Sequence, residues 1–221
     1  MEKERLVKLS FVGDLEVTYK VNNEAKIKGN YDFLFENLKK ELRNTDYLVG
    51  NLETPIAGKK LGYTNELYCF NTPEEFLKTL KKYNFKLLTT ANNHCLDRGV
   101  KGLKKTLENI EKYGLESIGT YRIKEQSEKV FIKNIEGLKI AFITATYGTN
   151  ISYNKVKLKD NELFMVDMLR DTRNDFHISK ADVLKRKIKK NFCRLISINT
   201  RNKLKQILKK EQKESNHIVI D

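Results

Sequence analysis

The stretch LLTTANNHCLDRG, residues 87–99, is the most informative part of the sequence about the fold, because an apolar run is followed directly by a polar triplet. An apolar run of the length of Leu87–Ala91 is typical of a buried strand in a parallel sheet. Asn92, Asn93 and His94 follow it without an intervening loop. Two amides and an imidazole in a row are poor strand and core residues, so the triplet is a candidate site.

The same arrangement occurs twice earlier in the chain. Gly13-Asp14 follows the apolar run 6–12, and Asn51-Leu52-Glu53 follows the run 47–49. In open α/β sheets, residues just past the carboxyl ends of the strands share one edge, where sites are built. We therefore expect the side chains of the three segments to converge.

The converging residues have the chemistry of a site for hard metal ions and phosphate. Asp14, Glu53 and Asn93 offer oxygen donors, which suit hard cations, and His94 offers a group that can transfer a proton. Each has a plainer interpretation. Gly-Asp is common in turns, Asn51 and Glu53 can cap or solvate a loop, and the Asn93-His94 pair can belong to a structural loop network. Three such polar segments, each at the end of an apolar run, favour a common site over these separate structural roles.

The rest of the pattern predicts an α/β fold, because strands and helices alternate as they do in a parallel sheet with right-handed crossovers. A helix is expected over residues 31–42, with Asn30 as its cap and an apolar stripe of Phe33, Leu34, Leu38 and Leu42. Another begins after Thr72 in a capping box with Glu75, with Phe76, Leu77 and Leu80 facing the core. The remaining expected strands are at 6–12, 46–50, 67–71, 85–91, 115–119 and 163–166, with a hairpin of 129–135 and 138–147. Further helices are expected at 100–113, with Leu103, Leu107 and Ile110 on one face, and at 179–191 and 200–212, which are basic.

The composition is strongly basic. The net charge is +14, and residues 151–221 hold 18 Lys and Arg against 9 Asp and Glu. A basic tail can bind nucleic acid, but no aromatic platform or recognisable motif accompanies the charge, so a nucleic-acid partner is disfavoured. Solvated helix faces rich in lysine are the simpler interpretation.

The cysteines and the hydropathy indicate a cytoplasmic chain. Cys69, Cys95 and Cys193 match no zinc or redox spacing, which favours reduced structural thiols. A tuned thiol at Cys95, beside His94, is the alternative. The sequence has no apolar run long enough to span a membrane and no signal peptide at its start. Membrane association or a surface location would require a longer natural form.

Three segments give the chain a family resemblance: Phe11–Asp14, Gly50–Pro55 and Ala91–Gly99. They resemble the CapA family of poly-γ-glutamate (capsule) synthesis proteins, which has a calcineurin-like metallophosphoesterase fold. Gly102-Leu103 with Thr106-Leu107, Gly119, and Thr146–Asn150 also match. The resemblance is clear from about residue 6 to 150 and weaker to about 169.

The resemblance implies a role for each matching residue. Asp14, Glu53 and Asn93 would be metal ligands, with Glu53 in the position of a bridging carboxylate, and His94 would be the catalytic histidine. The cofactor would be a divalent metal, namely Mn, Mg or Zn. Asn51, Asn92, Tyr147 and Asn150 would line the side that binds a small-molecule or polymeric anionic substrate. Asp97 would hold the entry of the following helix.

The chain also departs from the family pattern. Asp14-Leu15-Glu16 lacks the histidine of the usual Asp-x-His motif. The later His-Trp-Gly and Gly-His-x-Pro-His motifs are also missing, because the sequence contains no Trp and its last histidine is His217. Residues 1–169 would be the CapA-like part, and 170–221 a basic helical segment leading into an interrupted strand at 217–221. The expectation is an incomplete calcineurin-like fold, a mixed sheet flanked by helices. It would hold one weakly bound ion and be a poor enzyme alone. The alternative is a non-enzymatic truncated remnant or binding subunit of the same fold.

Overall fold

The computed structural model describes residues 6–65 and 68–173, whose centre is a four-stranded sheet. The strands are β1 (Leu9–Asp14), β2 (Tyr47–Asn51), β3 (Phe85–Thr89) and β4 (Glu116–Ile118). They lie side by side in chain order, and every neighbouring pair is parallel. The predicted α/β fold is confirmed, with strand positions close to those expected.

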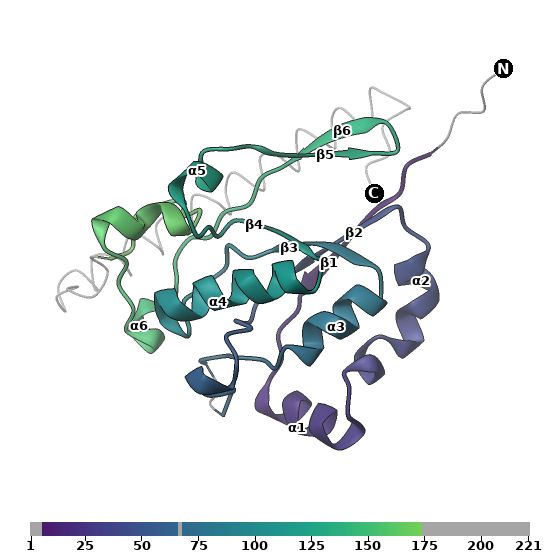
Figure 1. Cartoon of the computed structure of the whole chain (residues 1–221), viewed down its shortest axis with the longest axis horizontal. Helices are drawn as coiled ribbons and strands as arrows, with labels where there is room; N and C mark the ends of the chain where they lie inside the picture. Colours follow the sequence, from purple (N-terminus) through teal and green to yellow (C-terminus); the bar gives the residue numbers. More distant parts are fainter. Residues whose placement is uncertain (1–5, 66–67, 174–221) are drawn as a thin grey trace, which may run out of the picture. The chain divides into compact units, whose positions relative to one another are not determined.

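Helices cover one face of this sheet (Figure 1). They are α1 (Tyr19–Lys28), α2 (Lys39–Arg43), α3 (Glu75–Lys82) and α4 (Gly99–Lys112). The apolar stripes expected of the last two are confirmed, because Phe76, Leu77 and Leu80 of α3 and Leu103, Leu107 and Ile110 of α4 are all buried. They pack with Leu48, Phe85 and Leu88 of the central strands in one core.

An antiparallel hairpin covers the other face (Figure 1). Its strands, β5 (Phe131–Ile135) and β6 (Leu138–Phe142), are joined at Glu136-Gly137, as predicted. Both turn residues have positive φ, 51° and 91°, which is typical of a tight two-residue hairpin turn. Ile135 and Phe142 pack with Tyr47, Val49, Leu87 and Ile118, which explains why the central strands are apolar on both faces.

The segment between β1 and β2 differs from the prediction. The helix expected over 31–42 is replaced by two 3₁₀ turns, Asp32–Leu34 and Glu36–Leu38, followed by the short α2. Leu38, expected in the core, is half exposed, whereas Tyr31 and Phe35 are buried against Phe76. Docking of these two rings overrides the helical pattern.

Helix α1 was not expected from the sequence. Six of its ten residues are charged or amide side chains, and Ala25 is its single buried residue. Asn30 caps no helix: its Oδ1 accepts a hydrogen bond of 2.9 Å from the Asp32 amide in a local turn, and Tyr31 is the cap residue of the 3₁₀ turn that follows.

Three smaller predictions were wrong. Residues 68–71 of the strand expected at 67–71 are not in a strand, and Leu163–Val166 belongs mainly to a 3₁₀ helix, Asp160–Met165. Thr72 does not cap α3, since its buried hydroxyl pairs with that of Thr54 at 2.8 Å.

Three short elements complete the described chain: a 3₁₀ turn at Lys59–Leu61, α5 (Lys124–Ser127) and α6 (Ile151–Asn154). The helices expected at 179–191 and 200–212, the strand at 217–221 and Cys193 lie outside the described residues. The predicted division near residue 169 stays a prediction.

Gly119, just past β4, provides a test of the close packing at this end of the sheet. Its φ is +103°, and an added Cβ would lie 2.3 Å from Thr144 Oγ1 and 2.7 Å from Ala91 Cβ. We predict that Gly119→Ala lowers the free energy of unfolding by about 3 kcal/mol, through backbone strain and overpacking. Urea denaturation measures the loss.

Gly137→Ala is the matched control for this substitution. Gly137 has a φ of +91°, but nothing lies within 4 Å of the Cβ that alanine would add. This variant isolates the cost of the backbone conformation, about 1 kcal/mol. An equal cost in both variants would contradict the close packing around Gly119.

Candidate functional site at the strand ends

The strand register brings the ends of all four strands into one row. Asp14 of β1 lies opposite Asn51 of β2, Asn51 opposite Thr89 of β3, and Thr89 opposite Ile118 of β4. The polar segments that follow the strands therefore begin at the same edge of the sheet. The predicted convergence of these segments has this alignment as its structural basis.

The side-chain amide of Asn51 is the centre of the site. Its Nδ2 donates to Asp14 Oδ1 at 2.8 Å and to Glu53 Oε2 at 3.2 Å, so that one amide group joins both carboxylates. Its Oδ1 accepts from Asn92 Nδ2 at 3.1 Å and from the Thr89 hydroxyl at 3.3 Å. Asn51 thus connects the ends of β1, β2 and β3 through side chains.

Asn92 extends this network into the loop after β3. It is buried, its Nδ2 also donates to the Leu52 carbonyl at 2.9 Å, and its Oδ1 accepts from the His94 amide at 3.1 Å. The side chain therefore holds the backbone that presents His94. A direct contact of Asn51 or Asn92 with substrate stays a prediction.

Glu53 lies in an electrostatically unusual environment. Partial burial, the hydrogen bond it shares with Asp14 and the negative charge of Asp14 raise the pKa of Glu53 to about 7, and His94 acts in the opposite direction. Glu16 adds a smaller unfavourable charge. Two carboxylates held this close without a cation repel each other, so one of them holds its proton more tightly.

His94 is held from both sides. Its Nδ1 lies 2.6 Å from Asp97 Oδ2, which also accepts from the Phe70 amide at 2.8 Å. The Phe70 ring packs on the imidazole with 4.4 Å between ring centroids. Nε2 faces the Asn150 amide at 3.4 Å. These contacts fix the ring and direct Nε2 toward the segment that carries Asn150.

Asp97 has a different part from the one expected. It does not cap α4, for which Arg98 is the cap residue without a side-chain bond. The buried Asp97 side chain instead anchors the histidine three residues before it. The spacing His94-x-x-Asp97 in a tight turn was the available signal for this pairing. Phe70 and Glu16 were not anticipated as parts of the site either.

Two predicted site residues are less tightly connected. Asn93 is half-buried, and its side chain forms no hydrogen bond with another residue in the described ranges. Tyr147 is 64% exposed and stacks with the Arg170 guanidinium at 4.3 Å from the ring centroid. Asp14, Asn51, Glu53, Asn92, His94 and Asn150 are joined by direct contacts or by electrostatic interaction.

The donor set fits a hard divalent cation. Residues 6–65 and 68–173 contain no group of three His, Cys, Asp or Glu side chains arranged for a metal. The set is instead two carboxylates, of Asp14 and Glu53, with amide oxygens nearby. Oxygen donors suit Mg²⁺ and Mn²⁺, which keep several waters, better than Zn²⁺. A cation would also offset the burial and the Asp14 charge that together raise the pKa of Glu53.

Cys95 is not an activated thiol. Burial raises its pKa to about 12, so it stays protonated at neutral pH. Cys95 forms no disulfide. The structure therefore supports the interpretation of Cys95 as a structural residue.

Comparison with known proteins identifies the family. The profile of the bacterial capsule synthesis protein family PGA_cap matches residues 8–221. The chain belongs to this family. It is 33% identical over 139 residues to the PGA biosynthesis protein CapA of Bacillus subtilis (strain 168), which covers 62% of this chain and 36% of that protein.

A second relative gives the same picture. The chain is 28% identical over 148 residues to the capsule biosynthesis protein CapA of Bacillus anthracis, covering 66% of this chain and 36% of that protein. The chain thus spans about a third of the length of the curated relatives it matches. Among the described residues, no helix of this family member is long and apolar enough to cross a bilayer.

Glu53 makes the stability of the metal-free protein depend on pH. Its pKa is about 7 in the folded state against 4.5 ordinarily, so folding favours the protonated form, and this stability is lost as pH rises from about 5 to 8. We predict that Glu53→Gln stabilises the fold relative to the natural chain more at pH 8 than at pH 5. Urea denaturation in the presence of a chelator measures this difference.

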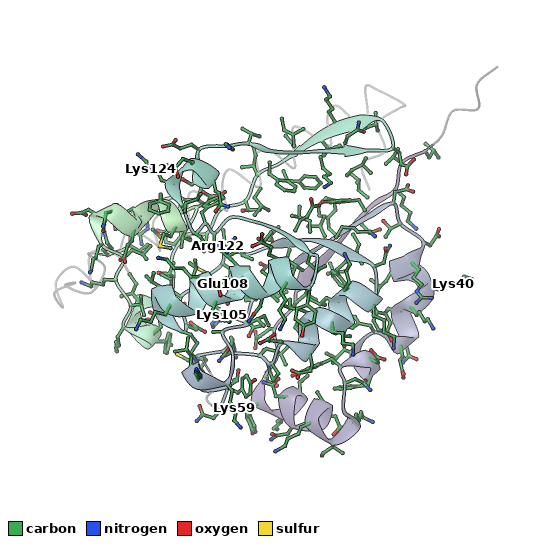
Figure 2. The ribbon with its side chains drawn as sticks, viewed as in Figure 1. Lys40, Lys59, Lys105, Glu108, Arg122 and Lys124 are labelled. Atoms are coloured by element: carbon green, nitrogen blue, oxygen red, sulfur yellow. The ribbon has the colours of Figure 1, made fainter. Side chains whose placement is uncertain are left out.

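Glu108→Gln is the control, because Glu108 lies on the exposed side of α4 (Figure 2). Its effect on stability is expected to stay constant over the same pH range. If the Glu53→Gln difference were equally flat, Glu53 would not titrate abnormally.

Asp97→Ala tests the anchoring of His94. The substitution removes the acceptor shared by His94 Nδ1 and the buried Phe70 amide. We predict a loss of about 2 kcal/mol in the free energy of unfolding. Glu108→Ala should change it by no more than about 0.5 kcal/mol. Similar losses in the two variants would show that Asp97 holds nothing in place.

Proposed function

We propose that the strand-end site binds one divalent cation and the phosphate group of an anionic substrate, and that it serves capsule polymer synthesis. The observation that carries this proposal is the shared Asn51 amide, which holds the Asp14 and Glu53 carboxylates together beside His94. Few structural roles account for the half-buried carboxylate of Glu53 held beside the exposed carboxylate of Asp14, since their repulsion costs stability.

Each side chain has a distinct task in the proposed chemistry. Asp14 and Glu53 bind the cation, with Asn93 as a third oxygen donor. A bound divalent cation would offset the negative charge of a phosphate group and make water more acidic. Asn51 keeps the two carboxylates in register, so that they need little rearrangement when the ion binds.

His94 is the proposed proton donor. With Nδ1 held by Asp97, the imidazole directs Nε2 toward the Asn150 amide, 3.4 Å away. A proton on Nε2 can pass to an oxygen on which negative charge develops, and the buried Asp97 carboxylate balances the charge of the imidazolium. In this proposal the Asn150 amide binds the same oxygen, which its approach to His94 Nε2 supports.

The proposed substrate class is supported by this chemistry and by the names of the two relatives. Both curated relatives are named for capsule or PGA biosynthesis. A phosphate ester or an acyl phosphate connected with the polymer suits a cation beside a proton donor. The reaction we propose is hydrolase-like, in a metallophosphoesterase-like, calcineurin-like site.

The number of ligands in the described part favours weak metal binding. Asp14, Glu53 and Asn93 provide three protein oxygens, and the rest of the shell of a Mg²⁺ or Mn²⁺ ion would be water. This small ligand set also favours a second candidate, a binding subunit of the same fold that holds anionic substrate without turning it over. Turnover separates the two candidates.

Titration calorimetry with Mn²⁺ and with Mg²⁺ tests the site. We predict binding of one ion by the natural chain, with affinity reduced at least tenfold in Asp14→Asn and Glu53→Gln, because each removes a charged ligand. Glu108→Gln, on the exposed face of α4, should bind as the natural chain does. Absence of binding, or binding unchanged in the first two variants, would refute the proposal.

Metal-dependent hydrolysis of a chromogenic phosphodiester separates the enzyme from the binding subunit. Under the enzyme proposal, Mn²⁺ supports slow turnover that falls by a factor of about 100 or more in His94→Gln, as expected for loss of a general acid. Metal binding without turnover would favour the binding subunit. Turnover that survives in His94→Gln would remove His94 from the mechanism.

A further inference from the structure

The imidazole of His94 is covered in the structure, although the proposed chemistry requires it to meet a substrate. Its side chain is 10% exposed. The Phe70 ring packs on it with 4.4 Å between ring centroids, and the Asn150 amide nitrogen lies 3.4 Å from Nε2. A phosphate oxygen that approaches Nε2 has to displace one of these two side chains. One side of the cover must therefore move before His94 can act.

Phe70 is the firmly held side of the cover. Its side chain is buried, and its own amide donates to Asp97 Oδ2 at 2.8 Å. The next residue, Asn71, is fully buried as well; its side chain accepts from the Ala57 amide at 2.8 Å and donates to the Gly58 carbonyl at 3.0 Å. Moving Phe70 would break several of these buried hydrogen bonds, which is costly. Phe70 is therefore the fixed wall beside His94.

Asn150 belongs to a short segment that is held less firmly. This segment, the strap, comprises residues 150–155 and contains α6. The residues on either side of α6, Asn150 and Lys155, both have positive φ, of 50° and 58°. This conformation is unfavourable for residues with a side chain, and such backbone strain is concentrated at binding sites and switch regions. Ile151 is the one buried residue of the strap, so the strap is the more easily moved side of the cover.

A pair of exposed tyrosines joins the strap to the segment that carries Phe70. The rings of Tyr153 and Tyr68 stack with 5.0 Å between centroids, although both residues are more than half exposed. Tyr153 lies three residues after Asn150, and Tyr68 lies two residues before Phe70. The stack thus connects the two segments that cover His94. An aromatic pair stabilises such a contact only modestly, which suits a contact that opens and closes.

We propose that the strap is a gate over His94, held closed by the stacking of Tyr153 on Tyr68 and opened to admit the anionic substrate. In the closed state Asn150 occupies the approach to Nε2. Ile151 keeps the strap attached to the core while the Asn150 side chain withdraws far enough for one substrate oxygen to reach the imidazole. Gating of this kind shields a site from water until the substrate is bound. The purpose of the gate rests on the proposed function, whereas its opening does not.

Carbethoxylation by diethyl pyrocarbonate measures access to His94 without metal and without turnover. The full chain is labelled at fixed pH, and modification of His94 is quantified by mass spectrometry against an unstructured histidine peptide in the same solution. We expect His94 to react at least about tenfold more slowly than the reference peptide, because the reaction requires local opening. Reaction at the rate of the reference would overturn the proposal.

Substitutions at Tyr153 test what holds the gate closed. Tyr153→Ala should raise the rate of His94 labelling by about fivefold, the equilibrium factor that an aromatic pair supplies. Tyr153→Phe keeps the stack and should label as the natural chain does. Tyr19→Ala, which removes an exposed ring from α1, is the matched control and should also leave the rate unchanged. Equal rates in Tyr153→Ala and Tyr153→Phe would overturn the proposal.

Asn150→Gly tests the cover itself. Glycine tolerates the positive φ at this position, so the variant removes the covering amide and keeps the backbone. His94 should label faster in this variant than in the natural chain, and an unchanged rate would overturn the proposal. Absence of Mn²⁺ binding by the natural chain would refute the proposed function instead, and the labelling rates would still decide whether the strap opens.

Discussion

The Asn51 carboxamide is the interaction on which the rest of the site depends. Its donor side holds two carboxylates, from the ends of β1 and β2, and its acceptor side holds Asn92 and Thr89 from the end of β3 and the loop after it. A single planar amide can do this because parallel pairing places three strand ends in one row. The fold thus provides the alignment, and the amide converts it into a defined distance between the charges.

The sequence predicted the central strands well, because both faces of the sheet are buried and such strands require apolar residues. Leu48, Leu87 and Leu88 form apolar runs because helices cover one face of the sheet and a hairpin covers the other, and such runs predict parallel central strands. The convergence of Asp14, Glu53 and His94 followed from the strands alone. Glu136-Gly137 marked the hairpin for the same reason, since its turn geometry has a narrow choice of residues.

The sequence was less informative where long-range contacts override local pattern. The 31–42 segment breaks into short turns because Tyr31 and Phe35 pack on Phe76, which no local periodicity reveals. Helix α1 buries only Ala25, so it has no apolar stripe to detect. The Phe70 contact with His94 was hidden as well, because the two residues come from separate loops. Asp97 is a different case: it was expected at the helix entry, although its spacing of three residues from His94 is a local signal for the pairing.

Membership of the capsule synthesis family and the geometry at the strand ends lead to one central claim: Asp14 and Glu53 form a cation site beside His94. The most direct test is a crystal of the full chain soaked in Mn²⁺, with the ion located by anomalous scattering. Our account predicts a peak between the two carboxylates, with metal–oxygen distances of roughly 2.1 Å, near the hard-cation values. A peak elsewhere on the chain, or none at saturating Mn²⁺ with both carboxylates in place, would contradict it.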